Sequence, residues 1–142
     1  MHKNLDIDAV LDDLVAKDPR FRRDAYHFIR DALDHTQRSL LKSQKSQPRH
    51  VSGQELLEGI RQFALEQFGP MARVVFDEWG VQRCEDFGDL VFNMIEANLL
   101  GKTDKDSRED FKGGYDFFDA FEKPFLPEGT ANPRAEPEAK AP

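Results

Sequence analysis

The side chains of this chain that could perform chemistry are few and scattered. His27, Asp31 and His35 are spaced four residues apart, so on a helix they would project from roughly one side. Histidines at i and i+4 can share a metal ion, but over eight residues the face drifts, and no glutamate occupies the general-base position of a metalloprotease helix. A polar helix face is the favoured interpretation, and the sequence predicts no metal site.

Cys84 is the single cysteine, and neither it nor the carboxylates predict a catalytic centre. Arg83 and a nearby helix start would lower the pKa of the thiol, whereas Glu85 and Asp86 oppose that effect. Adjacent carboxylates on a helix point apart, which makes the acidic pairs poor acid–base candidates. We expect no catalytic residue and no cofactor, and a non-enzymatic role is favoured. An enzyme whose site forms only in three dimensions remains open.

Length and composition indicate one soluble domain. The chain has 142 residues, of which 39% are hydrophobic and 33% charged, and it contains twelve phenylalanines. One cysteine allows no intrachain disulfide and favours a reducing compartment. The first residues are acidic, unlike a signal peptide, and no apolar run approaches the roughly 18 residues of a membrane span. We therefore expect a cytoplasmic protein without a membrane partner.

The net charge of −7 is unevenly distributed. Residues 1–50 contain 10 basic and 8 acidic side chains, whereas residues 51–126 contain 8 and 16. Phosphates would be repelled by the acidic part, which argues against general nucleic-acid binding there.

Apolar spacing predicts a mainly α fold with five helices, at residues 6–17, 23–43, 53–68, 70–79 and 86–100. Ser52 and Glu55 form a capping-box pattern before the third helix, and Gly80 and Gly101 are placed to end the fourth and fifth. In the short fourth helix we expect an inward face of four residues: Met71, Val74, Val75 and Trp79.

The three helices of residues 52–101 have the order of a winged helix, which would place the last of them in a DNA groove. The stretch from Cys84 to Gly101, which includes that helix, contains Glu85, Asp86, Asp89 and Glu96 and no lysine or arginine. A helix with this charge would be repelled by phosphates, so we interpret it as a packing helix that faces the core or a protein.

The segment after Gly101 allows two interpretations. Gly113-Gly114 could form a two-residue hairpin turn, giving a short C-terminal hairpin, whereas Tyr115, Phe118 and Phe121 recur every three residues and fit a short helix. Residues 127–142 are rich in proline, alanine and glutamate and predict a disordered tail. The predicted organisation is one helical domain over residues 1–126, followed by this tail.

Two sets of residues are candidates for binding. The first is a basic patch on the second helix and its loop, which could meet RNA, DNA or an acidic protein: Arg22, Arg23, Arg38, Lys42, Lys45 and Arg49. The second is a C-terminal aromatic strip that is either core or a docking surface: Phe117, Phe118, Phe121 and Phe125.

Three segments also carry a resemblance: HVSGQELLEGIRQFALEQFGPMA from His50, WGVQRCEDFGDLVFNMIEANLLGK from Trp79 and DFKGGYDFFDAF from Asp110. The chain, over about residues 20–126, resembles an uncharacterised family of small bacterial proteins, chiefly from verrucomicrobia, planctomycetes and related lineages. The resemblance implies a bacterial, cytoplasmic, single-domain protein and transfers no activity, cofactor or catalytic residue.

The function that the sequence favours is a non-enzymatic protein-interaction module. Its partner would be a protein that meets the acidic face of the third to fifth helices or the C-terminal aromatic strip. The alternative is a nucleic-acid- or ribosome-associated regulator that uses the basic patch. Because phosphate contacts release counterions, the alternative predicts affinity that falls steeply with salt.

Overall fold

The structure, a computed structural model, describes residues 6–44, 51–101 and 108–127. It contains five α-helices: α1 (Ile7–Lys17), α2 (Arg23–Gln44), α3 (Gly53–Phe68), α4 (Ala72–Trp79) and α5 (Cys84–Glu96). Four short helical turns accompany them: η1 (Gly69–Met71), η2 (Arg108–Phe111), η3 (Phe118–Glu122) and η4 (Lys123–Phe125). No strand occurs in these ranges, and the predicted mainly α fold is confirmed. None of the described helices is long and apolar enough to cross a membrane.

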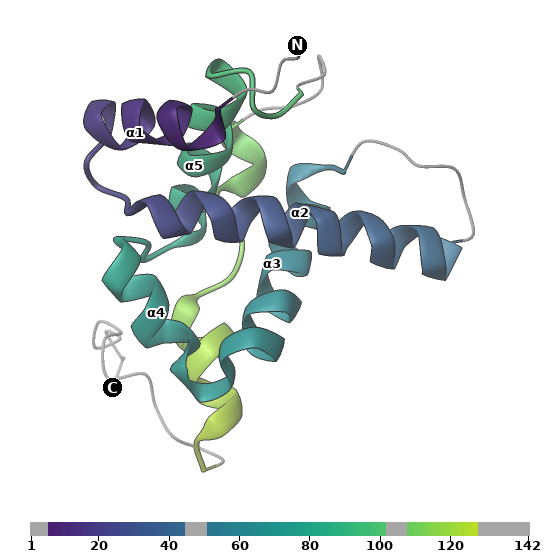
Figure 1. Cartoon of the computed structure of the whole chain (residues 1–142). Coiled ribbons are helices and arrows are strands. Elements are labelled where there is room, and N and C mark those ends of the chain that lie inside the picture. Colours follow the sequence, from purple (N-terminus) through teal and green to yellow (C-terminus); the bar gives the residue numbers. More distant parts are fainter. Residues whose placement is uncertain (1–5, 45–50, 102–107, 128–142) are drawn as a thin grey trace.

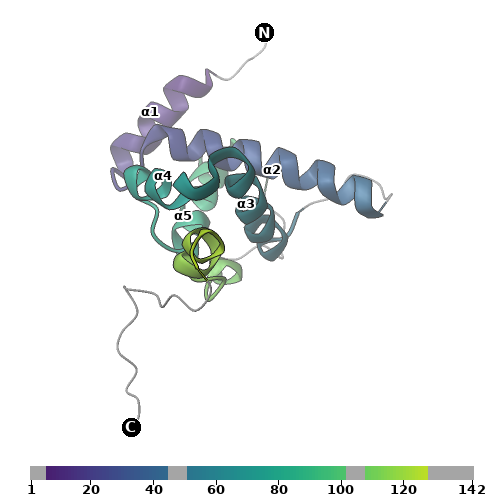
Figure 2. The same ribbon diagram turned by 90° about the horizontal axis from the view of Figure 1, so that it is seen from below.

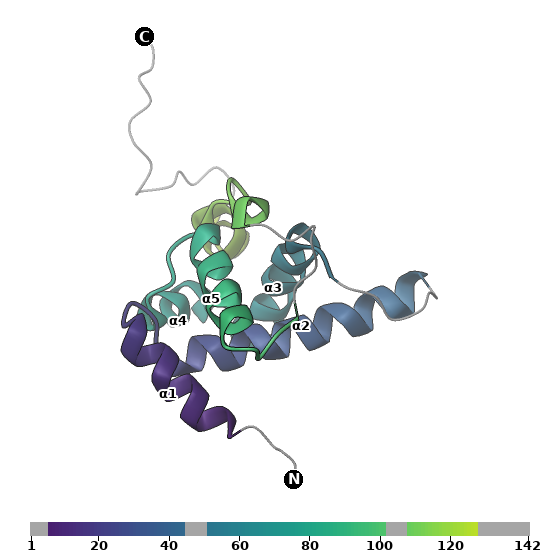
Figure 3. The ribbon, with the colours of Figure 1, turned by 90° about the horizontal axis from the view of Figure 1, so that it is seen from above.

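The helix α2 is the element on which the other four α-helices pack. It runs across the width of the molecule and contacts each of them, α3 most extensively (Figure 1). Seen from above, α3 and α5 lie on one side of α2 and α1 on the other (Figure 3). Residues at helical spacing form its buried face: Ala25, Tyr26, Ile29, Ala32 and Thr36. The segment 52–101 therefore does not build its core alone, because α3 and α5 each pack on α2.

The crossing of α2 and α3 is unusually close, because a glycine of α3 faces Thr36 of α2. A Cβ atom placed on Gly59 would lie 1.7 Å from Thr36 Oγ1, which leaves no room for any side chain. The Thr36 hydroxyl is itself buried and donates a hydrogen bond to Ala32 O at 2.7 Å. Its polar atom is thus satisfied within α2, and the two helices meet through van der Waals contact.

Phenylalanine rings fill the core between α2, α4 and α5, with Phe76 at the centre. Its ring centroid lies 5.1–5.7 Å from those of four other rings, which are Phe28, Phe87, Phe117 and Phe121. The predicted inward face of α4 was wrong at Met71 and Val74, each 54% exposed. Because η1 occupies residues 69–71 and α4 begins only at Ala72, the inward face follows Ala72 and Phe76.

The ends of the helices agree with the sequence in two cases and differ in one. The capping box is confirmed, with Glu55 N bonded to Ser52 Oγ and Ser52 N to Glu55 Oε1. Gly80 ends α4 in the left-handed region, at φ 86°, and a Cβ there would lie 1.9 Å from Arg20 O. The helix α5 ends at Glu96, before the predicted Leu100, because Asn98 adopts φ 63° and Leu99 N bonds back to Met94 O.

Between residues 108 and 125 the chain forms helical turns, so the helical alternative is the correct one and the hairpin does not form. Gly113 takes φ 63° in the turn between η2 and Tyr115. The yellow-green turns η3 and η4 then follow, with η3 against α3 and α4 (Figure 2). The described part of the chain accordingly lacks the strands of a wing. The predicted disordered tail, apart from Pro127, lies outside the described residues.

Replacing Gly59 by alanine is expected to destabilise the fold by about 1 to 3 kcal/mol, because the new methyl overlaps Thr36. Chemical denaturation measures the loss. A smaller loss is expected in a Thr36→Ala background, where the closest atom is removed. Gly101→Ala is the control, since nothing lies within 4 Å of a Cβ there. Equal effects at Gly59 and Gly101 would contradict the close crossing.

Candidate functional site

The predicted basic patch is not a single surface on the described residues. Arg22 and Arg23 lie at the start of α2, whereas Arg38 and Lys42 lie near its far end, about 22 Å further along the axis. Lys45 and Arg49 lie outside the described residues. The two groups therefore face different surroundings.

The three arginines of this set that the structure describes each form an ion pair with a carboxylate. Arg22 Nη2 lies 3.5 Å from Glu78 Oε2 of α4, and Arg23 pairs with Asp12 of α1. Arg38 pairs with Asp34, one turn earlier on α2. These pairs are solvent-exposed, so each contributes little to stability, but each also reduces the positive potential offered to a phosphate.

The C-terminal aromatic strip is largely core. Phe117, Phe118 and Phe121 are 3%, 2% and 0% exposed, whereas Phe125 is 46% exposed. Phe117 and Phe121 turn toward Phe76 and Phe87, because η3 packs against α4. The docking interpretation is therefore wrong for these three residues, and only Phe125 of the strip offers its ring to solvent.

Cys84 and His35 pack against their neighbours. The Cys84 thiol is buried, and its sulfur accepts a hydrogen bond from Tyr115 N at 3.3 Å and donates to Tyr115 O at 3.4 Å. Burial raises the pKa of this thiol to about 11, and Glu85 reinforces the effect. His35 packs its ring on Phe63 at 5.1 Å. Among the described residues, no three His, Cys, Asp or Glu side chains gather to hold a metal ion.

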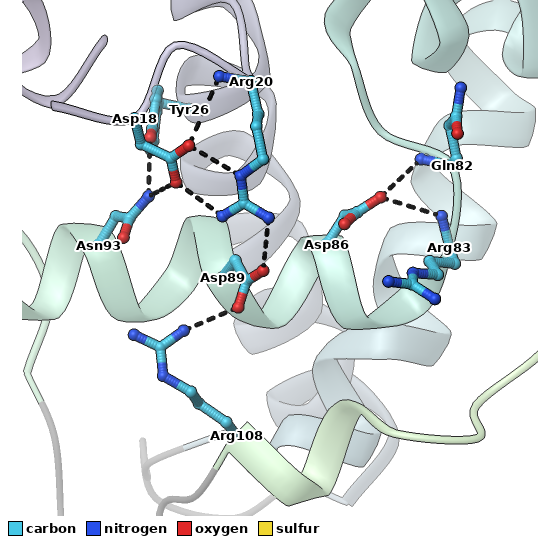
Figure 4. Close-up of polar contacts among 9 residues, drawn as sticks. All are labelled: Asp18, Arg20, Tyr26, Gln82, Arg83, Asp86, Asp89, Asn93 and Arg108. Carbon is cyan, nitrogen blue, oxygen red and sulfur yellow. Dashed lines mark hydrogen bonds and ion pairs between the residues drawn. The ribbon is translucent and has the colours of Figure 1, made fainter. Parts of the chain in front are cut away.

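Acidic residues of α5 bind neighbouring parts of the chain. The Arg20 guanidinium donates to both oxygens of Asp18, at 2.8 and 2.7 Å, and also to Asp89 Oδ2 at 3.1 Å. From the other side, Arg108 Nη1 donates to Asp89 Oδ1 at 2.8 Å. Figure 4 shows Asp89 between the two arginines, one from the α1–α2 connection and one from η2. Asp89 thus links three segments far apart in sequence.

The same network continues to the buried side of α5. Asn93 Nδ2 donates to Asp18 Oδ2 and to the Tyr26 hydroxyl, both at 3.0 Å (Figure 4). The hydrogen bonds that Arg20 donates to Asp18 lower the pKa of Asp18 to about 2, and the same bonds raise the pKa of Arg20. Sequence analysis missed this network, because Arg20 and Arg108 stand 69 and 19 residues from Asp89 and no helical period relates them.

An apolar cavity of about 140 Å³ lies beside this network. It is enclosed by α2, the start of α3, the end of α5 and η2. Eight apolar side chains line it: Leu33, Val51, Leu56, Val91, Phe92, Ile95, Leu100 and Phe111. Its remaining lining residues are Gln37, Ser52, Gly53, Gly101 and Asp110. No lining residue is a histidine, cysteine, lysine or arginine, and the hydroxyl oxygen of the lining residue Ser52 accepts the capping hydrogen bond from Glu55 N.

The wall formed by η2 is fixed by shape and by charge. Phe111 is 3% exposed and packs against two glycines, since a Cβ on Gly53 or Gly88 would lie within 3.1 Å of its ring. The Arg108 guanidinium, held by Asp89, stacks 5.0 Å from the centre of the Phe92 ring, which lines the cavity. The charged network therefore holds one wall of the apolar cavity in place.

Two polar side chains border the cavity from different elements. Gln37 belongs to α2 and Asp110 to η2. Within the described ranges, neither side chain has a hydrogen bond or ion pair with another residue. The arrangement can hold an apolar group in the cavity while a carboxylate and an amide remain free to contact a polar group attached to it.

No protein-family model, curated protein or solved structure matches the chain. The resemblance to the small bacterial family consequently remains a prediction. The site must be interpreted from its own geometry.

The Cys84 thiol is expected to react slowly with a disulfide reagent in the folded protein. A pKa of about 11 leaves, at pH 8, about one-hundredth of the thiolate that a pKa of 9.0 would give. The measurement is the rate of reaction with 5,5′-dithiobis(2-nitrobenzoate) in buffer and in denaturant. Equal rates in the two solutions would show that the thiol is neither buried nor bonded to Tyr115.

Asp18→Asn is expected to lower the free energy of unfolding at pH 7 by about 1 to 2 kcal/mol, since it removes a charged acceptor of Arg20. The folded-state pKa of Asp18 is depressed from 3.8 to about 2, so its stabilisation is present above about pH 4 and lost as the pH falls toward 2. The variant and the wild type should converge in denaturation experiments across that window. Asp13→Asn, at an exposed position of α1, is the control and should show no such convergence.

Proposed function

We propose that the protein is a non-enzymatic, cytoplasmic protein-interaction module that receives one apolar side chain of a partner protein in the cavity between α2, α3, α5 and η2. The observation that carries the proposal is the cavity itself, with its eight apolar side chains and its fixed η2 wall. Anchor residues that bury a bulky side chain in such a pocket supply much of the affinity of protein interfaces.

The size of the cavity favours a side chain over a drug-sized molecule. Sites for such molecules typically measure about 300–1,000 Å³, whereas this cavity measures about 140 Å³. An apolar cavity of about 150 Å³ holds one benzene ring, which is the apolar part of a phenylalanine. A partner that inserts one such side chain would bury it fully and rest its backbone on the rim.

The charges support a protein partner over a nucleic acid. The described arginines of the predicted basic patch are divided between the two ends of α2 and are paired with carboxylates. The cavity is lined by Asp110, whose carboxylate would repel phosphates. A nucleic-acid- or ribosome-associated regulator remains the alternative, and the experiment below separates the two.

Val91→Phe is expected to fill the cavity, leave the fold intact and abolish partner binding. The wild-type chain would be immobilised and exposed to lysate of its native cell, with and without nuclease. Val74→Phe is the matched control, because it makes the same change at an exposed position of α4. Circular dichroism verifies folding of both variants.

A partner retained by the wild type and Val74→Phe and lost by Val91→Phe supports the proposal. Retention of every partner by a folded Val91→Phe variant would show that the cavity is not the site. Loss of all partners after nuclease treatment would instead favour the nucleic-acid alternative.

A further inference from the structure

We infer that the apolar group received by the cavity is followed by a positive charge, which Asp110 binds at the rim. The inference rests on the proposed function and specifies the partner: a protein segment in which a bulky apolar residue adjoins a lysine or arginine. The same chemistry, an apolar group joined to a cation, also occurs in free arylalkyl amines, and the experiment distinguishes the two sources.

Asp110 is placed for this role by packing. Asp110 is partly buried in η2. A Cβ on Gly53 would lie 2.7 Å from the Asp110 Cβ, so the first carbon of the Asp110 side chain packs against the start of α3. Phe111 fixes the next residue between Gly53 and Gly88. The carboxylate thus stays beside the cavity, and no other described residue neutralises it with a hydrogen bond or ion pair.

Described cations on the elements around the cavity lie beside carboxylates. Each described cation of η2 and its following turn is paired, Arg108 with Asp89 and Glu96, and Lys112 with Glu109. On α2, Arg38 pairs with Asp34, and Arg30 shares a surface hollow with Asp31 and Asp34. The start of α3 contributes about half a positive charge, against the full negative charge of Asp110. Among the described residues that line the cavity, Asp110 is the one with a charged side chain.

Gln37 of α2 completes the site. It is exposed on α2 and lines the cavity, and its amide can accept a hydrogen bond from an N–H group as well as donate one. An ammonium or guanidinium group held beside the cavity could thus donate to Asp110 of η2 and to Gln37 of α2. A carboxylate there would face Asp110 without compensation, so the site should discriminate by charge.

Three probes of similar shape test the charge preference on the full chain: 2-phenylethylammonium, ethylbenzene and 3-phenylpropionate. Binding is followed by NMR titration of the Leu33, Val91 and Ile95 methyl groups. The ammonium probe is expected to bind about tenfold more tightly than the carboxylate probe, the size of one charge-assisted hydrogen bond. Asp110→Asn should remove most of that ratio and leave ethylbenzene binding unchanged. Asp119→Asn makes the same charge change at an exposed position of η3 and should preserve the ratio.

The outcomes separate this inference from the proposed function. Equal affinity for the ammonium and carboxylate probes, or an affinity ratio that Asp110→Asn does not change, would overturn the inference. Binding of ethylbenzene in the same experiment would still support the cavity as a site for an apolar group. Failure of all three probes to shift the methyl signals would contradict both. Acetyl-Phe-Lys-amide should bind more tightly than acetyl-Phe-Glu-amide. If the free amine binds and neither dipeptide does, the site takes a small amine and the protein partner is wrong.

Discussion

The fold depends on the contact between Gly59 of α3 and Thr36 of α2. Dispersion attraction falls off steeply with distance, so two helices that approach without an intervening side chain gain contact along both backbones. That approach is available only where one helix lacks a Cβ, and any side chain at residue 59 would collide with Thr36. While α2 and α3 are packed against each other, α4 and α5 also pack on α2.

Ion pairs position the two segments that the aromatic core does not hold, the α1–α2 connection and η2. A phenylalanine cluster buries apolar surface, but apolar contacts do little to fix the orientation of a segment. The α1–α2 connection and η2 also place few large apolar side chains in this cluster. Asp89 orients both segments, because it accepts hydrogen bonds from Arg20 on one side and from Arg108 on the other. Both guanidiniums also stack on rings, Arg20 on Phe21 and Arg108 on Phe92. Such charges, which sequence alone marks as repulsive to DNA, are used here to join segments within the chain.

The sequence predicted the structural features that depend on residues close together in the chain, and it did not predict those that depend on contacts between distant segments. Helical spacing and the capping box predicted α1, α2 and α3 to within two residues, because both depend on neighbours three or four residues apart. The inward face of α4 was misjudged, since η1 shifted the helix start and rotated the face by a residue. The burial of Phe117, Phe118 and Phe121 depends on α4, and the cavity depends on four segments of the chain. Neither the burial of these rings nor the cavity produces a regular spacing of residue types along the sequence, so the sequence alone does not reveal them.

The tryptophan fluorophore and the cavity lie at different ends of α3. The only tryptophan, Trp79, packs against Phe28, Phe68 and Phe76, near the end of α3, where Phe68 is the last residue. The cavity borders Gly53, the first residue, which is about 22 Å away along the helix axis. Tryptophan fluorescence therefore reports the aromatic core at one end, and Trp79 is not among the residues that line the cavity at the other. A spectroscopist following binding in this protein needs a second chromophore, placed at the start of α3.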